Sequence, residues 1–153
     1  MLKIADYDDL DEFYKELEKQ TIASLEKTAQ EIRQGWMDLI ETEIYDSYSP
    51  SVYNRQNSLY NSIMISPVRK SNGEYSIDIY ASDEMHSKND TWRDDWLDNT
   101  TYSNIFDRFK ENGFYGRDGE SIDVIKMTNE EWIENGKANK LILNYLSKWF
   151  DIE

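Results

Sequence analysis

The side chains that could do chemistry are few, and their spacing is poor for it. His86 is the single histidine, and the sequence contains no cysteine. Metal sites usually need several His, Cys or carboxylate ligands at fixed offsets, and nothing around His86 has such a spacing. The acidic run Asp90, Asp94, Asp95 and Asp98 lacks the turn glycine and the closing glutamate of an EF-hand loop. We therefore expect neither a metal site nor a bound cofactor.

Groups for acid–base or nucleophilic catalysis do not form a recognisable set either. There is no Gly-rich phosphate loop, and one histidine does not convincingly serve a Ser–His–Asp arrangement. The chain has 31 Asp and Glu residues, so that no carboxylate pair stands out as an acid/base couple. The sequence favours a protein that binds other macromolecules over an enzyme. A carboxylate-based hydrolase is kept only as a third alternative.

Composition and charge narrow the class of partner. The 153 residues suit one domain, and a hydrophobic fraction of 39% with 14% aromatic residues argues against disorder. The net charge of −14 disfavours direct binding to nucleic acid or to an anionic membrane, since both reward positive charge. An acidic face that is merely solvated and one that attracts a basic partner both remain open. No secretory signal or membrane span is predicted, which indicates a soluble intracellular protein.

The periodicity of the sequence predicts an α+β fold. It consists of a long N-terminal helix, an antiparallel hairpin-based sheet, and a short helix and a C-terminal helix packed on it. The first helix is expected over 1–48, because apolar residues recur there in three- and four-residue steps. These are Leu10, Phe13, Leu17, Thr21, Leu25, Ala29, Ile32, Trp36, Leu39 and Ile40. So long a helix is expected to bend near Gln20–Thr21 or at Gly35, or to project and find partners.

The middle of the chain predicts a crossover and a hairpin over 49–80, followed by an acidic loop over 81–101. Pro50 ends the first helix, because the residue before a proline avoids the α region. Asn72-Gly73 between alternating apolar runs is a strong hairpin signal, and Pro67 is expected at an edge or an irregularity. The loop is unusually long for a compact domain, and such loops are often functional.

The last third, 102–153, is expected to contain a helix, a turn, a short strand and the C-terminal helix. The short helix carries Ile105, Phe106 and Phe109 on one side. The strand is expected at Ile122–Ile125. Thr128 with Glu131 three residues later forms a predicted capping box that begins the closing helix.

Two stretches hold the candidate binding residues. The crossover is rich in Tyr and Ser, and its isolated Arg55 is expected to pair with an acid of another element or subunit. The acidic loop carries Trp and Arg, which dominate the energetics of interfaces. The interface candidates are Tyr48, Tyr53, Arg55, Trp92, Arg93, Asp94, Asp95 and Trp96. An alternative without any partner is that the crossover tyrosines only pack over Pro50.

The crossover also carries a pattern that resembles a known group of proteins. It reads Tyr-x-Pro-x-x-Tyr-x-Arg-x-x-x-Leu-x-x-Ser-Ile, with its fixed positions at Tyr48, Pro50, Tyr53, Arg55, Leu59, Ser62 and Ile63. Placed between a long N-terminal helix and a hairpin, it resembles the small tail-completion and head–tail joining (neck) proteins of tailed bacteriophages. The resemblance implies a sheet packed by helices and a ring-forming subunit between portal and tail tube, without enzymatic activity.

Two functional hypotheses follow. The first is a phage structural subunit that forms a homo-oligomeric ring and contacts adjacent neck or tail proteins, located in the virion or the host cytoplasm. The second is an acidic DNA mimic that inhibits a host nuclease, as an anti-CRISPR or anti-restriction protein, because acids cluster at 6–18 and 83–98. The net charge fits both hypotheses, whereas the crossover pattern favours the first.

Overall fold

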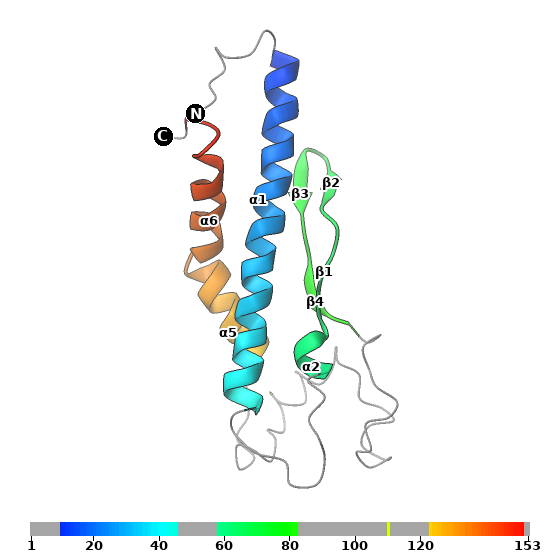
Figure 1. Ribbon diagram of the computed structural model, residues 1–153, viewed down its shortest axis with the longest axis vertical. Coiled ribbons are helices and arrows are strands. Elements are labelled where there is room, and N and C mark those ends of the chain that lie inside the picture. Colours follow the sequence, from blue (N-terminus) through cyan, green and yellow to red (C-terminus); the bar gives the residue numbers. More distant parts are fainter. Residues whose placement is uncertain (1–9, 46–57, 83–109, 111–122, 152–153) are drawn as a thin grey trace.

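One long helix runs the length of the molecule, and the other elements lie along it. The computed structural model describes residues 10–45, 58–82, 110 and 123–151. Helix α1 spans Leu10–Leu39 and continues as a π-helical segment, η2, over Ile40–Tyr45. The hairpin lies on one side of α1 and the C-terminal helices lie on the other (Figure 1). The α+β fold class is confirmed.

The predicted long helix does not break at either of the two sites considered. α1 is α-helical through Gln20–Thr21 and through Gly35, and its geometry changes only at Ile40. Gly35 has a packing role instead of a bending role. A Cβ atom at this position would lie 2.7 Å from Nε1 of Trp132, whose ring is 4% exposed. The missing side chain lets the indole pack directly on the backbone of α1.

The predicted apolar stripe of α1 is correct at its C-terminal half and wrong at its start. Ala29, Trp36 and Ile40 are buried, whereas Leu10 is 57% exposed. In the N-terminal half, polar Gln20 and Ser24 are buried instead. Their polar groups find partners on the same helix: Gln20 Nε2 donates to Glu16 Oε1 at 2.7 Å, and Ser24 Oγ donates to the Thr21 carbonyl at 2.7 Å. Hydrogen-bonded polar groups can be buried at little cost.

Residues 63–81 form the predicted hairpin, with four short strands. β1 (Ile63–Ile65) pairs antiparallel with β4 (Ile79–Ala81), and β2 (Arg69–Ser71) pairs antiparallel with β3 (Glu74–Ser76). The turn between β2 and β3 is Asn72-Gly73, with φ angles of 52° and 78°. A two-residue type I′ turn requires positive φ at both central positions, which Asn-Gly supplies.

The hairpin ladder is interrupted where Pro67 was expected to disturb it. Ile65 faces Ile79, but Arg69 faces Ser76, so three residues (66–68) oppose two (77–78). The extra residue is a bulge, and Pro67 lies within it because proline cannot donate to the ladder. Around the bulge Ser66 keeps the strands together: its N–H donates to the Asp78 carbonyl, and its hydroxyl accepts from the Asp78 N–H, both at 2.9 Å.

The C-terminal part is helical where a strand was expected. It contains α5 (Val124–Asn129), a π-helical segment η5 (Glu130–Glu134) and α6 (Lys137–Leu146). The predicted strand is wrong at Val124 and Ile125, which begin α5. Asp123 is the helix cap, since its Oδ1 accepts from the Lys126 N–H at 2.9 Å. This cap, together with the burial of Val124 against α1, overrides the β preference of the branched residues.

The predicted capping box is also wrong. Thr128 lies inside α5, is buried, and donates its hydroxyl to the Val124 carbonyl at 2.9 Å. The break before the last helix occurs later, at Gly136, whose φ is 72°. The predicted acidic loop beyond Ser82 and the helix expected at Ile105–Phe109 lie outside the described residues.

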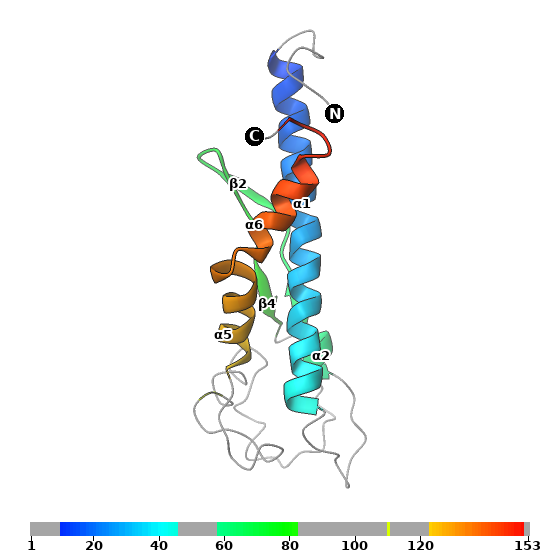
Figure 2. The same ribbon diagram turned by 90° about the vertical axis from the view of Figure 1, so that its left-hand side faces the viewer.

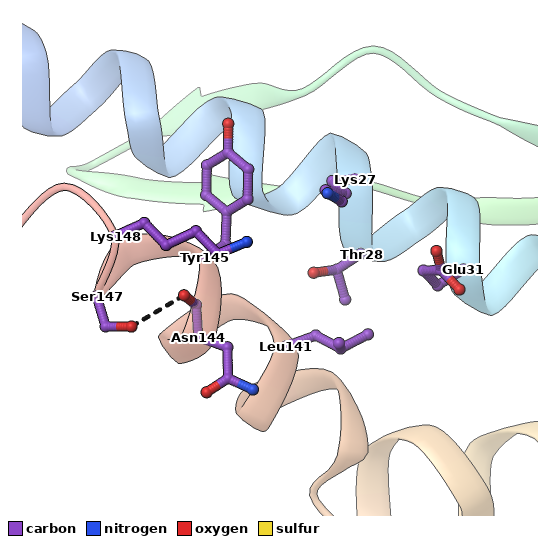
Figure 3. A pocket seen from close by; sticks show the side chains of 8 residues that line it. All are labelled: Lys27, Thr28, Glu31, Leu141, Asn144, Tyr145, Ser147 and Lys148. Atoms are coloured by element: carbon purple, nitrogen blue, oxygen red, sulfur yellow. Dashed lines mark hydrogen bonds between the residues drawn. The ribbon is translucent and has the colours of Figure 1, made fainter.

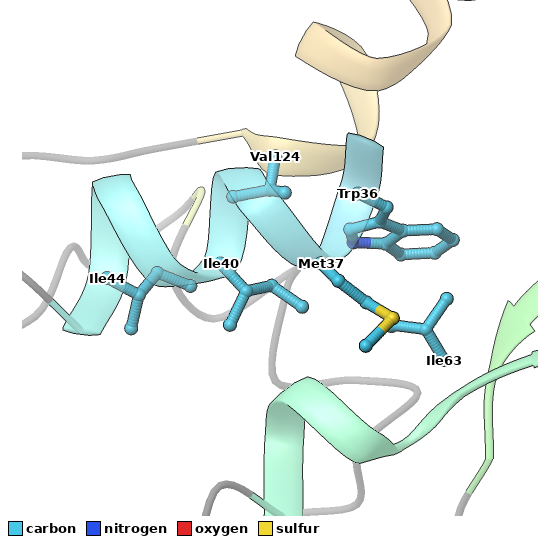
Figure 4. Packing of buried hydrophobic residues seen from close by; sticks show 6 residues of the cluster. All are labelled: Trp36, Met37, Ile40, Ile44, Ile63 and Val124. Carbon is cyan, nitrogen blue, oxygen red and sulfur yellow. The ribbon is translucent and has the colours of Figure 1, made fainter. Parts of the chain in front are cut away.

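The apolar core lies toward the C-terminal end of α1, where the hairpin and α5 meet the long helix (Figure 4). Side chains from three separate parts of the chain form it. They are Trp36, Met37, Ile40, Ile44, Ile63 and Val124, with Leu39, Tyr60, Ile79, Ala81 and Met127 packed around them. Burial of each large aliphatic side chain stabilises the fold by about 1.5–3 kcal/mol, so this cluster holds the hairpin, α5 and α1 together.

The contact at Gly35 makes a specific prediction about stability. Gly→Ala in a helix interior normally stabilises by roughly 1 kcal/mol. Gly35→Ala should instead lower the free energy of unfolding by about 1–3 kcal/mol, because the new methyl group overlaps the buried Trp132 ring. Urea denaturation measures the change, with the exposed Gln30→Ala on the same helix as the control. A Gly35→Ala protein at least as stable as wild type would contradict this packing.

Candidate functional site

The candidate interface residues lie outside the described part of the structure, but the residues that flank them are described. The candidates are Tyr48, Tyr53, Arg55, Trp92, Arg93, Asp94, Asp95 and Trp96. The flanking positions are Tyr45, Ser58, Ser82, Lys110 and Asp123. Four of these positions begin, end or adjoin an element: η2 ends at Tyr45, α2 begins at Ser58, Ser82 follows β4, and Asp123 precedes α5. These elements lie in the lower part of the molecule in Figures 1 and 2, near the apolar core.

Two contacts involve these flanking positions. The Ser82 N–H donates to the Ser62 carbonyl at 2.8 Å, which joins the end of β4 to the beginning of β1. Lys110 Nζ lies 3.6 Å from Asp123 Oδ2, the cap of α5. The segment with Trp92–Trp96 therefore follows a residue bonded to the start of the hairpin, and Lys110, beyond its other end, contacts the cap of α5.

The crossover pattern has its last two positions inside the core. Ser62 and Ile63 are both 0% exposed, and Ile63 packs with Ile40 and Val124. The crossover pattern therefore ends in the apolar core. Leu59 lies in the short helix α2 (Ser58–Asn61), but its side chain lies outside the described part.

Arg33 anchors the same position from α1, and the sequence analysis did not single it out. Its Nε donates to the backbone carbonyl of Ile63, 30 residues away. Ile44, on the other side of the crossover, is 3% exposed in the same cluster. The residues on both sides of 46–57 are thus held by one core. The sequence signals Arg33 only by its spacing: it lies three residues before Trp36, on the same side of the helix as this buried residue.

A second attachment joins the tip of the hairpin to the N-terminal half of α1. Glu18 Oε1 accepts from Lys70 Nζ at 2.7 Å and from the Tyr75 hydroxyl at 2.9 Å. These two hydrogen bonds lower the pKa of the Glu18 carboxyl, and the bond to Glu18 raises the pKa of Lys70. The three residues come from α1, β2 and β3, so local spacing in the sequence does not reveal the contact.

On the opposite side of α1 a groove of about 460 Å³ runs between α1 and α6 (Figure 3). Its lining residues are Lys27, Thr28, Glu31, Leu141, Asn144, Tyr145, Ser147 and Lys148. Lys27 Nζ lies 5.7 Å from the centre of the Tyr145 ring. The groove presents ammonium, carboxylate, hydroxyl and amide groups, which are suited to hydrogen bonding and charge pairing with a partner.

Within the described ranges, no three or more His, Cys, Asp or Glu side chains come together in a way that could hold a metal ion. Nor is any described helix long and apolar enough to cross a membrane.

Comparison with known proteins places the chain in a family. The family model described as YomN matches residues 9–148, nearly the whole sequence. The chain belongs to the YomN family. This is a phage-derived (SPβ-like prophage) protein family. No curated protein and no solved structure matches the chain.

The Arg33 contact predicts how the crossover is anchored. Arg33→Met should lower the free energy of unfolding by about 1–3 kcal/mol, because it removes a charged hydrogen bond to the carbonyl of the buried Ile63. Chemical denaturation measures the effect, with the exposed Lys15→Met as the control for loss of one positive charge on α1. Equal stability of the two variants would show that the Arg33 contact contributes nothing.

The hairpin tip should depend on pH through Glu18. A depressed carboxyl pKa stabilises the folded arrangement above the ordinary value of 4.5, and the contribution is lost as the pH falls through the lowered pKa. The amide resonance of Tyr75, followed by NMR, should therefore titrate with a midpoint below 4.5 in the wild type and lose this transition in Glu18→Gln. An unchanged transition in Glu18→Gln would assign the titration to another carboxyl.

Proposed function

We propose that this YomN-family protein is a non-enzymatic structural subunit of a phage particle, a tail-completion or head–tail connector component that acts through protein–protein assembly. The phage-derived family supports a role in a phage. The order of long helix, crossover and hairpin, with the Ser62–Ile63 end of the crossover pattern buried in the core, supports the finer assignment.

The attachment of the candidate segments to one end of the scaffold supports this proposal most directly. Tyr48, Tyr53 and Arg55 belong to a segment held at Ile44 and Ile63, and the Trp92–Trp96 candidates follow β4, which pairs with β1. A subunit of a ring between two larger assemblies needs a stable body that presents recognition residues from a common base. The cluster around Ile40, Ile63 and Val124 supplies that base.

The acidic DNA mimic is the alternative, and the charge distribution favours it less. A mimic of the DNA backbone needs a continuous acidic surface, since it competes for basic channels through rows of carboxylates. Residues 135–150 contain three lysines and no acidic residue, which interrupts such a surface along α6.

A phage that lacks the gene tests the proposal. Electron microscopy of lysates should show filled heads and separate tails that are not joined, and the titre should be restored by the wild-type protein in trans. Complementation by Arg55→Ala combined with Trp92→Ala should fail, whereas the exposed Gln30→Ala should complement fully.

Joined particles in normal numbers from the deletion phage would overturn the proposal. Normal particles that grow poorly only on a host with an active nuclease would instead indicate the DNA mimic.

A further inference from the structure

The charges of the described helices are segregated. Residues 135–150, which include α6, carry Lys137, Lys140 and Lys148 and no acidic residue, in a chain whose net charge is −14. Over residues 10–45 the chain has nine acidic and four basic residues, a net of −5. The two helices pack side by side, so one molecule presents a basic surface and an acidic surface on neighbouring elements (Figure 2).

Of the three lysines on the α6 side, one has an ion-pair partner among the described residues and two do not. Lys137 contacts Glu131, with Nζ to Oε1 at 2.8 Å. Among the described residues, Lys140, Lys148 and Lys27 form no ion pair. Lys148 lines the groove between α1 and α6 together with Lys27 and Glu31 of α1, so the groove itself carries both signs of charge (Figure 3). We call Lys140 and Lys148, on the α6 side, the basic surface.

An exposed acidic row lies at the C-terminal end of the long helix, where α1 continues as η2. Asp38 and Glu41 are three residues apart, which keeps them on one side of the helix. Both are exposed, and neither has a cationic partner among the described residues. The Gln34 amide donates to Asp38 Oδ1 at 2.8 Å and adds no charge to the row.

Apolar side chains adjoin the basic surface in the sequence and remain uncovered. Leu143, between Lys140 and Lys148, is 52% exposed, and Trp149, next to Lys148, is 37% exposed. Charge pairs at a rim steer association and fix its register, whereas apolar contacts exclude water from it. The α6 side therefore combines the two elements that a protein interface uses.

We propose that the basic surface of one molecule docks on the acidic row in a second copy of the same chain. The two surfaces are different, so the contact is head-to-tail, and repetition of such a contact closes into a ring when the rotation permits. Charge complementarity selects the second copy as occupant, because the acidic row is opposite in charge to the unpaired lysines and lies on the same protein. The inference rests on the proposed ring-forming function and identifies one contact that would build the ring.

Charge reversal on each surface tests the contact. Lys140→Glu with Lys148→Glu should raise the dissociation constant for self-association at least about tenfold, and Asp38→Lys with Glu41→Lys should do the same, because like charges then face each other. An equimolar mixture of the two double variants should associate again, since each reversed surface meets a complementary one on the other variant. Sedimentation velocity measures all three samples, and circular dichroism verifies that each variant is folded.

A matched control carries the same change of charge elsewhere. Lys19→Glu with Lys126→Glu alters two exposed lysines away from both surfaces and should self-associate as the wild type does. Salt should weaken the wild-type assembly, most strongly at about 1 M, where the screening length is about 3 Å.

Two results would overturn the inference while leaving the proposed function standing. One is a wild-type ring unaffected by either reversal. The other is a wild-type protein that stays monomeric in solution, while a phage without its gene still fails to join heads and tails. That pair of results would mean that the partner is another particle protein. Normal joining in the deletion phage would instead remove the proposed function itself.

Discussion

The burial of Ile63 against α1 is the contact on which the rest of the described structure depends. Ile63 is the first residue of the hairpin and the last position of the crossover pattern, and it is fully buried beside Ile40 and Val124. Its carbonyl accepts from Arg33, so both its side chain and its backbone are bound to the long helix. Besides this contact the hairpin has the partly buried Ile79 and Ala81 at the edge of the core, and the Glu18 cluster at its tip, which is exposed and therefore weak.

The same core holds the described residues on both sides of the crossover. Ile44 and Ile63 belong to it, while α6 packs along the N-terminal half of the long helix (Figure 1). The two proposals use different parts of this architecture. The particle role rests on segments attached at the core end, and the contact between copies rests on exposed faces of α1 and α6.

Sequence reasoning succeeded where local chemistry determines structure, and failed where packing decides. Asn72-Gly73 predicted the turn because only residues that tolerate positive φ fit it, and Pro67 predicted the bulge because it cannot donate to the ladder. Val124 and Ile125 were predicted as a strand from their branched side chains, yet the Asp123 cap and burial against α1 make them helical. Gly35 was predicted as a bend in the helix. Its contact with Trp132, about a hundred residues away, has no local signal in the sequence.

The sequence by itself determined the α+β class, the long helix, the hairpin and its turn, since periodicity and turn residues act over a few neighbouring positions. It also indicated a phage protein, which the family comparison supports. Only the tertiary structure decided which helix faces are covered, that Arg33 binds the Ile63 carbonyl, and that α6 packs on α1 to form the groove lined by Lys27, Glu31 and Lys148. Those features depend on residues distant in sequence coming together, and no local sequence pattern reveals the free energy of that packing.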